Sequence, residues 1–204
     1  MLVKIFPNNI NDKLIKQAVE LIKKGSVIVV PTDTVYALAC DIYNNAAIEK
    51  IARMKNLKPE KANFSFVCYD LANITDFTKP FSNEVFRLMK SSLPGPFTFI
   101  LNANNQVPAI FKSNKKTIGI RVPDNEIIRA LVKELGHPVM VTSVRSDDEV
   151  LEYEPDASEI EANFGIDVDL VIDGGNSEFE PSTVIDCTGD QPVMVREGKG
   201  KVQS

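Results

Sequence analysis

The stretch Pro31-Thr-Asp-Thr-Val-Tyr-Ala-Leu-Ala-Cys-Asp41 decides the fold assignment, because it joins two apolar segments through a turn rich in hydroxyl groups. The run before it, Val27–Val30, has the composition of a buried strand. Pro31 cannot donate a hydrogen bond within a sheet, so we expect it to end the strand or to lie at the edge of the sheet. A second strand is expected to cover Val35–Ala39. Hydroxyl and carboxylate groups directly after a buried strand place polar atoms at the mouth of a sheet.

The composition is that of a soluble globular protein. The chain has 204 residues, of which 44% are hydrophobic and 25% are charged. No apolar run approaches the roughly 20 residues that a membrane helix needs, and Met1–Phe6 lacks the pattern of a signal peptide. The three cysteines are far apart and form no Cys-x-x-Cys motif, so we expect buried, reduced thiols in the cytoplasm rather than disulfides or a metal site: Cys40, Cys68 and Cys187.

The single histidine restricts the chemistry further. A zinc site built from several histidines is excluded, and a Ser-His-Asp triad would have to use His137. This residue stands between Gly136 and Pro138, just before an apolar run. The position is more typical of a loop or strand edge than of catalysis.

Charge is distributed unevenly along the chain. Residues 1–135 contain 19 Lys and Arg against 12 Asp and Glu, whereas residues 136–204 contain 4 against 16, which together give the net charge of −5. The basic part could bind anionic ligands or nucleic acid, or it could consist of ordinary solvated helix faces.

Hydrophobic periodicity predicts a mixture of helices and strands. Amphipathic helices are expected over residues 10–24, 46–55, 83–90 and 124–135, the last with Asp124 as its N-cap. Further strands are expected over residues 63–69, 97–101, 117–122, 139–143, 168–172, 183–186 and 193–196. Because the elements mix without strict alternation, we expect one α/β domain over residues 1–204, with a twisted mixed sheet flanked by helices. The acidic segment 146–157 is expected to be an exposed loop.

No glycine-rich phosphate-binding motif occurs, so a nucleotide would have to be held by side chains and strand ends. The polar candidates follow or end the expected strands. Arginine can fork onto a carboxylate or phosphate, lysine can act as a point charge, and hydroxyl groups can orient a ligand without adding charge. These candidates are Thr32, Tyr36, Lys55, the turn 94–98, Thr117, Arg121, Ser143, Arg145, Ser182, Thr183 and Arg196.

Five motifs in register resemble the YrdC/YciO family of threonylcarbamoyl-adenylate synthase-like proteins. They are Pro-Thr-Asp-Thr-Val-Tyr at 31–36, Pro-Gly-Pro-Phe-Thr at 94–98, Gly-Ile-Arg-Val-Pro at 119–123, Ser-Thr-Val-Ile-Asp at 182–186 and Arg-Glu-Gly at 196–198. The resemblance spans about Ser26 to Gly200. It implies a twisted α/β sheet with a large concave cavity.

The resemblance also implies a reaction, in which L-threonine, bicarbonate and ATP give threonylcarbamoyl-AMP and pyrophosphate for modification of tRNA at adenosine 37. ATP would carry Mg²⁺ into the site, and no protein nucleophile would be needed, because catalysis would rest on positioning and charge stabilisation. By resemblance, the threonine would contact Thr32, Arg121 and Ser182, and the nucleotide, ATP or AMP, would contact Lys55, Thr117, Ser143 and Arg196. We also assign Tyr36 to the substrate site and Arg145 to the nucleotide site.

Two departures bring the chain closer to the YciO branch of that family. The Lys-x-Arg signature of the synthases reads Lys55-Asn-Leu57 here, and their Ser-x-Asn signature reads Ser143-Val-Arg145. We hypothesise that Arg145 partly restores the positive charge missing at Leu57. The alternative is that Arg145 pairs with the neighbouring acidic segment Asp147–Glu149.

The departures leave a second function open, namely binding of a nucleotide or of double-stranded RNA or tRNA without turnover. A basic set of residues favours RNA, while the acidic overall charge and the few aromatic residues oppose it. That set is Arg53, Lys55, Lys58, Lys61, Lys112, Lys115 and Lys116.

Overall fold

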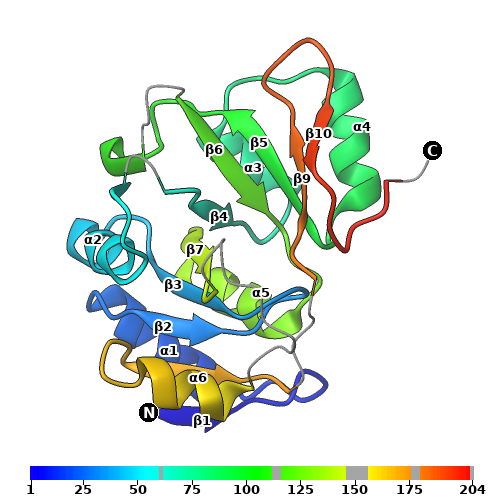
Figure 1. Cartoon of the computed structure of the whole chain (residues 1–204). Coiled ribbons are helices and arrows are strands. Elements are labelled where there is room, and N and C mark those ends of the chain that lie inside the picture. Colours follow the sequence, from blue (N-terminus) through cyan, green and yellow to red (C-terminus); the bar gives the residue numbers. More distant parts are fainter. Residues whose placement is uncertain (60–61, 112–115, 146–155, 176–179, 203–204) are drawn as a thin grey trace.

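One twisted, mixed ten-stranded sheet organises the chain (Figure 1), in agreement with the expected fold class. The computed structural model describes residues 1–59, 62–111, 116–145, 156–175 and 180–202. The strand order is β1-β8-β2-β3-β7-β4-β6-β5-β9-β10. In chain order the strands are β1 (Leu2–Lys4), β2 (Ile28–Val30), β3 (Ala37–Asp41), β4 (Ser65–Val67), β5 (Phe97–Asn102), β6 (Thr117–Arg121), β7 (Val139–Ser143), β8 (Leu170–Asp173), β9 (Thr183–Asp186) and β10 (Val193–Arg196).

Helices pack on both faces of this sheet. The described residues form α1 (Asp12–Lys23), α2 (Asn45–Met54), α3 (Leu71–Phe77), α4 (Asn83–Ser92), α5 (Glu126–Leu135) and α6 (Ala157–Phe164), with a short 3-10 helix η2 (Ala109–Phe111). Buried residues of α1 and α5 form one core cluster with one face of the sheet. Those of α2, α3, α4 and α6 form a second core cluster with the other face.

The start of α5 lies one residue later than the sequence predicts. The Asn125 side chain, not that of Asp124, caps the helix, because its Oδ1 accepts the amide hydrogens of Ile127 and Ile128 at 3.0 and 3.2 Å. Asp124 instead donates its amide hydrogen to the Asp33 carboxylate at 2.9 Å. Both side chains can cap a helix, and the tertiary contact with Asp33 selects the asparagine.

Several other boundaries differ from those expected. Strand β3 begins at Ala37, so that Val35 and Tyr36 belong to the turn before it. Strand β1 and helices α3 and α6 were not predicted, because β1 is only partly buried and contains Lys4, and seven or eight residues give a helix only about two turns of hydrophobic period. Most of the predicted acidic loop, residues 146–155, lies outside the described residues, and its last position, Ala157, begins α6.

The core on the α1 and α5 side covers only part of its face of the sheet. Its strand residues come from β2, β3, β4, β7 and β8, and none comes from β5, β6, β9 or β10. In β5 and β6 the residues of the opposite face, such as Phe99 and Ile120, are buried in the other core. Since side chains alternate along a strand, the neighbours of those residues face the side that α1 and α5 leave uncovered.

The cysteines agree with a further expectation. Cys40, Cys68 and Cys187 are free and buried, as predicted. No helix in the described part of the chain is long and apolar enough to cross a membrane.

Candidate functional site

A strip of small and polar residues runs across the uncovered half of the sheet. Strand register places Ser65 of β4 between Gly119 of β6 and Val141 of β7, on the side where Val141 joins the α1 and α5 core. Residues paired in register lie on the same face of the sheet, and side chains alternate between the two faces along each strand. The strip on this face therefore also includes Thr98, Thr117, Arg121 and Ser143. A Cβ at Gly119 would lie 2.7 Å from Ser65 Oγ, so a larger residue would force the Ser65 side chain to move.

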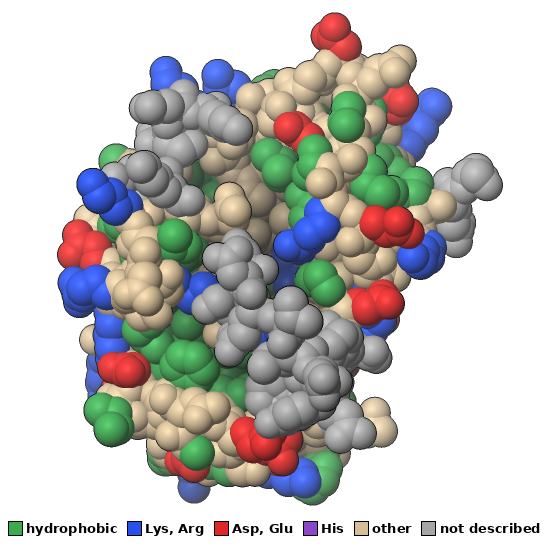
Figure 2. All heavy atoms as spheres, in the orientation of Figure 1, with side chains coloured by type: hydrophobic (Ala, Val, Ile, Leu, Met, Phe, Trp, Pro, Cys, Tyr) green, Lys and Arg blue, Asp and Glu red, His purple; other side chains and the backbone are tan. Residues whose placement is uncertain are grey.

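A hollow opens between the half of the molecule that carries β5, β6, β9 and β10 and the half that carries β2 and β3 (Figure 2). Basic side chains lie in its wall. The polar strip and the turn before β3 therefore meet where the two halves of the sheet join.

The turn 31–36 is held together by the hydroxyl group of Thr32. Thr32 Oγ1 donates to the carbonyl oxygen of Val35 at 2.8 Å and accepts the amide hydrogen of Thr34 at 3.0 Å. Thr34 Oγ1 in turn accepts a hydrogen bond from Arg121 Nη2 at 2.9 Å. The structure thus gives Thr32 an organising role in the turn, one bond away from the arginine.

The centre of the site is a buried ion pair between Asp33 and Arg121. Arg121 Nη2 donates to Asp33 Oδ1 at 2.8 Å, and the two side chains are 9% and 6% exposed. Burial lowers the pKa of the Arg121 guanidinium, the Asp33 carboxylate opposes this shift, and the nearby charge of Arg196 adds to it. Arg121 Nε is buried and has no hydrogen-bond partner among the described residues. A guanidinium with an unused donor is suited to a ligand oxyanion.

Arg196 lies against Ser182. Its Nε and Nη2 donate to the Ser182 carbonyl oxygen at 3.2 and 2.8 Å, and Nη2 also donates to Ser182 Oγ at 3.2 Å. Ser182 Oγ and Thr98 Oγ1 are 2.7 Å apart and share a hydrogen. The family resemblance assigns Arg196 to the nucleotide and assigns Arg121 and Ser182 to the threonine. In the structure Arg196 binds Ser182 and its charge acts on Arg121, so the three residues belong to one site.

A second group consists of Lys55, Ser143 and Arg145. Lys55 Nζ donates to the carbonyl oxygen of Ser143 at 2.9 Å and to that of Arg145. Ser143 Oγ accepts the amide hydrogen of Arg145 at 3.1 Å. The end of α2 is thereby fastened to the end of β7, which brings three predicted nucleotide residues together. The acidic residues proposed to pair with Arg145, at 147–149, lie outside the described residues.

Tyr36 and Thr117 occupy different positions. Tyr36 is fully buried, and its hydroxyl group donates to the Gly175 carbonyl oxygen at 2.8 Å and accepts the Gly174 amide hydrogen at 3.3 Å. Its backbone carbonyl accepts the amide hydrogen of Val144, which links the turn 31–36 to the second group. Thr117 begins β6, paired with Asn102, at the opposite end of the strand from Arg121.

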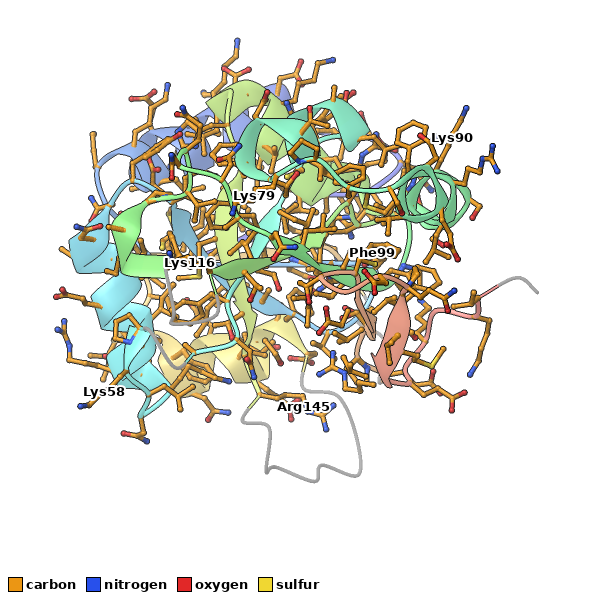
Figure 3. The ribbon with its side chains drawn as sticks, turned by 90° about the horizontal axis from the view of Figure 1, so that it is seen from above. Lys58, Lys79, Lys90, Phe99, Lys116 and Arg145 are labelled. Atoms are coloured by element: carbon orange, nitrogen blue, oxygen red, sulfur yellow. The ribbon has the colours of Figure 1, made fainter. Side chains whose placement is uncertain are left out.

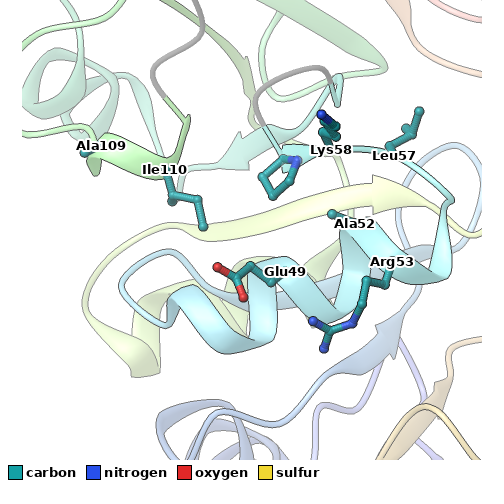
Figure 4. Close-up of a pocket in the computed structure, with 8 residues that line it drawn as sticks. Glu49, Ala52, Arg53, Leu57, Lys58, Ala109 and Ile110 are labelled. Atoms are coloured by element: carbon teal, nitrogen blue, oxygen red, sulfur yellow. The ribbon is translucent and has the colours of Figure 1, made fainter.

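Leu57 lines a separate cavity of about 480 Å³ between α2 and η2 (Figure 4). Apolar residues such as Ala52 and Ile110 line this cavity together with charged residues of both signs, namely Glu49, Arg53 and Lys58. Figure 3 shows Lys58 and Arg145 at separate places in the lower part of the view. Leu57, the position that departs from the synthase signature, is 43% exposed.

His137 lies away from the polar strip. It precedes β7, whereas Ser143 ends that strand, and its ring packs edge-on against Tyr43 with 4.9 Å between centroids. Its Nε2 is 3.7 Å from Asp41 Oδ1. The described residues contain no cluster of three or more His, Cys, Asp or Glu side chains that could hold a metal ion.

Three further polar residues of the quoted motifs take part in the site. Asp33 and Thr34 bind Arg121, and Thr98 shares a hydrogen with Ser182. The sequence marks all three as polar residues at strand ends or turns, within the motifs at 31–36 and 94–98. Their partners were not predicted, because each partner stands more than 80 positions away in the chain.

Comparison with known proteins gives relatives along the whole chain. The chain is 44% identical to the uncharacterised protein YciO of Escherichia coli (strain K12) over 201 residues, which is 98% of this chain and 96% of that protein. The crystal structure of E. coli YciO matches with a TM-score of 0.92 over 100% of this chain and 98% of that chain, at 42% identity.

More distant relatives carry named activities or ligands. Threonylcarbamoyl-AMP synthase of Bacillus subtilis (strain 168) is 30% identical over 194 residues, which cover 92% of this chain and 54% of that protein. A crystal structure of P. abyssi Sua5 complexed with L-threonine matches with a TM-score of 0.87 at 25% identity, over 97% of this chain and 57% of that chain. A family model described as "Telomere recombination" matches residues 20–198, and the chain accordingly belongs to the Sua5, YciO and YrdC family.

Proposed function

We propose that the protein forms a carbamoyl-adenylate from L-threonine, bicarbonate and ATP, releasing pyrophosphate. The observation that carries this proposal is the pair formed by Arg121, which binds Asp33, and Arg196, which binds Ser182. Arg121 Nε is also buried and has no hydrogen-bond partner among the described residues. The charge of Arg196 acts on Arg121, and an oxyanion bound between the two guanidinium groups would offset their repulsion. Similarity to the B. subtilis synthase and to Sua5 bound to L-threonine supports the choice of substrates.

The residues divide the work as follows. Arg121 and Arg196 bind the threonine carboxylate, Ser182 orients it by hydrogen bonding, and the group of Lys55, Ser143 and Arg145 binds the nucleotide phosphates. Mg²⁺ enters as part of the ATP substrate. The threonine amine attacks bicarbonate with loss of water, and the resulting carbamate oxygen attacks the α-phosphorus, from which pyrophosphate leaves. The chain supplies orientation and charge rather than a nucleophile.

The test is release of pyrophosphate from ATP and bicarbonate, with and without L-threonine. Release that depends on L-threonine is expected for the wild-type protein. Arg121→Lys keeps the positive charge but removes the planar, two-pronged donor geometry of the guanidinium, so that pyrophosphate release should fall at least about tenfold. Arg87→Lys, on the exposed face of α4, is the matched control and should leave the rate unchanged. Absence of threonine-dependent release would contradict the proposal.

Leu57 favours a second candidate function, which is nucleotide or RNA binding without turnover. At this position the chain lacks the arginine of the synthase signature, and it presents a cavity with Arg53 and Lys58 instead. RNA binding through several phosphates would weaken steeply with salt, by roughly 10³-fold or more between 50 and 200 mM for six contacts. Binding of AMP in the hollow would depend on salt far less. Titrations of double-stranded RNA, tRNA and AMP at both salt concentrations separate these cases.

A further inference from the structure

The backbone on either side of Lys199 is held tightly against the end of β9. The amide of Lys199 donates to the carbonyl oxygen of Pro181 at 2.9 Å. The amide of Gly198 donates to Thr183 Oγ1 at 3.0 Å, and that hydroxyl group donates to the carbonyl oxygen of Gly200 at 2.7 Å. Three hydrogen bonds therefore fix the Cα position of Lys199.

The two glycines allow this close approach. A Cβ at Gly198 would lie 2.3 Å from the carbonyl oxygen of Pro181, and a Cβ at Gly200 would lie 2.7 to 2.9 Å from three ring atoms of Phe97. Neither position accepts a side chain without a shift of its surroundings. Lys199 is the side chain that projects from between them, on a rigid base.

The amine of Lys199 reaches the residue that holds Arg121. Lys199 Nζ donates to the carbonyl oxygen of Asp33 at 2.8 Å, while Asp33 Oδ1 accepts from Arg121 Nη2 at 2.8 Å. The ammonium group of Lys199 and the guanidinium group of Arg121, which are far apart in the sequence, thus both bind one residue of the turn 31–36.

Three cations consequently converge on the site, since the charge of Arg196 also acts on Arg121. We propose that Lys199 is an anion-binding residue of this site, and that its amine exchanges the Asp33 carbonyl oxygen for a carboxylate or phosphate oxygen of the ligand. This inference rests on the proposed function, because it assigns a further residue to the same substrates. A lysine amine is suited to the exchange, because its three donors rotate on a flexible stem.

Equilibrium binding to the purified full chain tests the assignment. The ligands are L-threonine and L-threoninol, which differ by the carboxylate, and AMP and adenosine, which differ by the phosphate. The variants are Lys199→Met, which keeps the aliphatic stem, and Lys199→Arg, which keeps the charge. Lys201→Met is the matched control, because Lys201 Nζ bonds the exposed Glu197 at 3.0 Å and both side chains are 73% exposed.

Lys199→Met is expected to weaken binding of L-threonine, of AMP or of both by about tenfold, without affecting L-threoninol or adenosine. Loss for one anion alone identifies the group that the amine contacts. Lys199→Arg should recover part of the loss, and Lys201→Met should bind as the wild type does. Equal weakening of charged and neutral ligands, or unchanged binding of all four, would overturn the assignment.

The two proposals fail in different ways. If the wild type binds L-threonine and AMP and Lys199→Met does the same, the role of Lys199 is wrong while the site itself stands. If the wild type binds none of the four ligands, the proposed function is wrong and the assignment of Lys199 falls with it. Thermal unfolding of each variant separates loss of a ligand contact from loss of the folded structure.

Discussion

Asp33 and Arg121 stand 88 residues apart in the chain, and their side chains form a buried ion pair with 2.8 Å between Oδ1 and Nη2. The other carboxylate oxygen of Asp33 accepts the amide hydrogen of Asp124 just before α5. One carboxylate therefore connects the turn 31–36, the end of β6 and the start of α5. The orientation of the Arg121 guanidinium depends on this arrangement.

We expect Asp33→Ala to lower the free energy of unfolding by about 3–5 kcal/mol, because it leaves a buried guanidinium without its carboxylate. Urea denaturation measures the change. Glu20→Ala is the control, since Glu20 pairs with Lys23 on the surface at 3.4 Å and its loss should cost at most about 1 kcal/mol. Equal stability of the two variants would contradict a buried, stabilising pair.

The hydroxyl group of Tyr36 makes the stability of the fold depend on pH above about pH 9. Burial raises its pKa to about 12, the bond from the Gly174 amide works against that rise, and the charges of Asp173 and Asp156 add to it. The unfolded chain loses this proton near pH 10, before the folded chain does, so stability present below pH 10 is lost as pH rises toward 12. Between pH 9 and 11 the wild type should lose more unfolding free energy than Tyr36→Phe. Parallel urea curves for the two proteins would contradict this.

Gly119 forms the floor of the polar strip. A Cβ there would lie 2.7 Å from Ser65 Oγ and 3.3 Å from Thr98 Cγ2. We expect Gly119→Ala to destabilise the fold by about 1–3 kcal/mol through overpacking. Gly189→Ala is the control, because nothing lies within 4 Å of a Cβ at that position. Thermal unfolding of both variants measures the difference, and equal midpoints would show that the strip has room to spare.

The three thiols should react slowly in the folded protein. Burial raises the pKa of all three, for Cys187 to about 11, and nearby carboxylates raise them further. The thiolate is the reactive form, so at pH 8 we expect little reaction with a disulfide reagent and complete reaction of Cys40, Cys68 and Cys187 in urea. Rapid labelling of one native thiol would place it at the surface instead.

The hypothesis that Arg145 compensates for Leu57 has its own test. We expect Arg145→Ala to lower AMP affinity about tenfold, and Leu57→Arg in that background to restore part of the loss. Calorimetric titration measures both. Unchanged affinity in Arg145→Ala would refute the compensation. Lys50→Ala, which removes a positive charge from α2 outside the candidate site, serves as the charge-matched control.

The amphipathic period of α1 and the apolar runs of β2 and β7 were predictable because they depend on neighbouring residues alone. The same holds for the motifs that place Arg121 at the end of β6 and Ser182 just before β9. Strand β1 was not predictable, because it is only partly buried and contains Lys4, and α3 was not, because its seven residues make only about two helical turns. The N-cap of α5 was displaced by one residue because Asp124 donates its amide to Asp33, a contact that local sequence does not encode.

The sequence by itself determined the mixed α/β class, the polar ends of the strands and the membership of the family. Only the tertiary structure decided that Arg196 lies against Ser182, that Lys55 fastens α2 to β7, and that Lys199 reaches Asp33. The reason is physical. Periodicity reports which face of an element is buried, whereas the partners of a charged side chain follow from the strand order of the sheet, which brings residues 88 and 166 positions apart into contact.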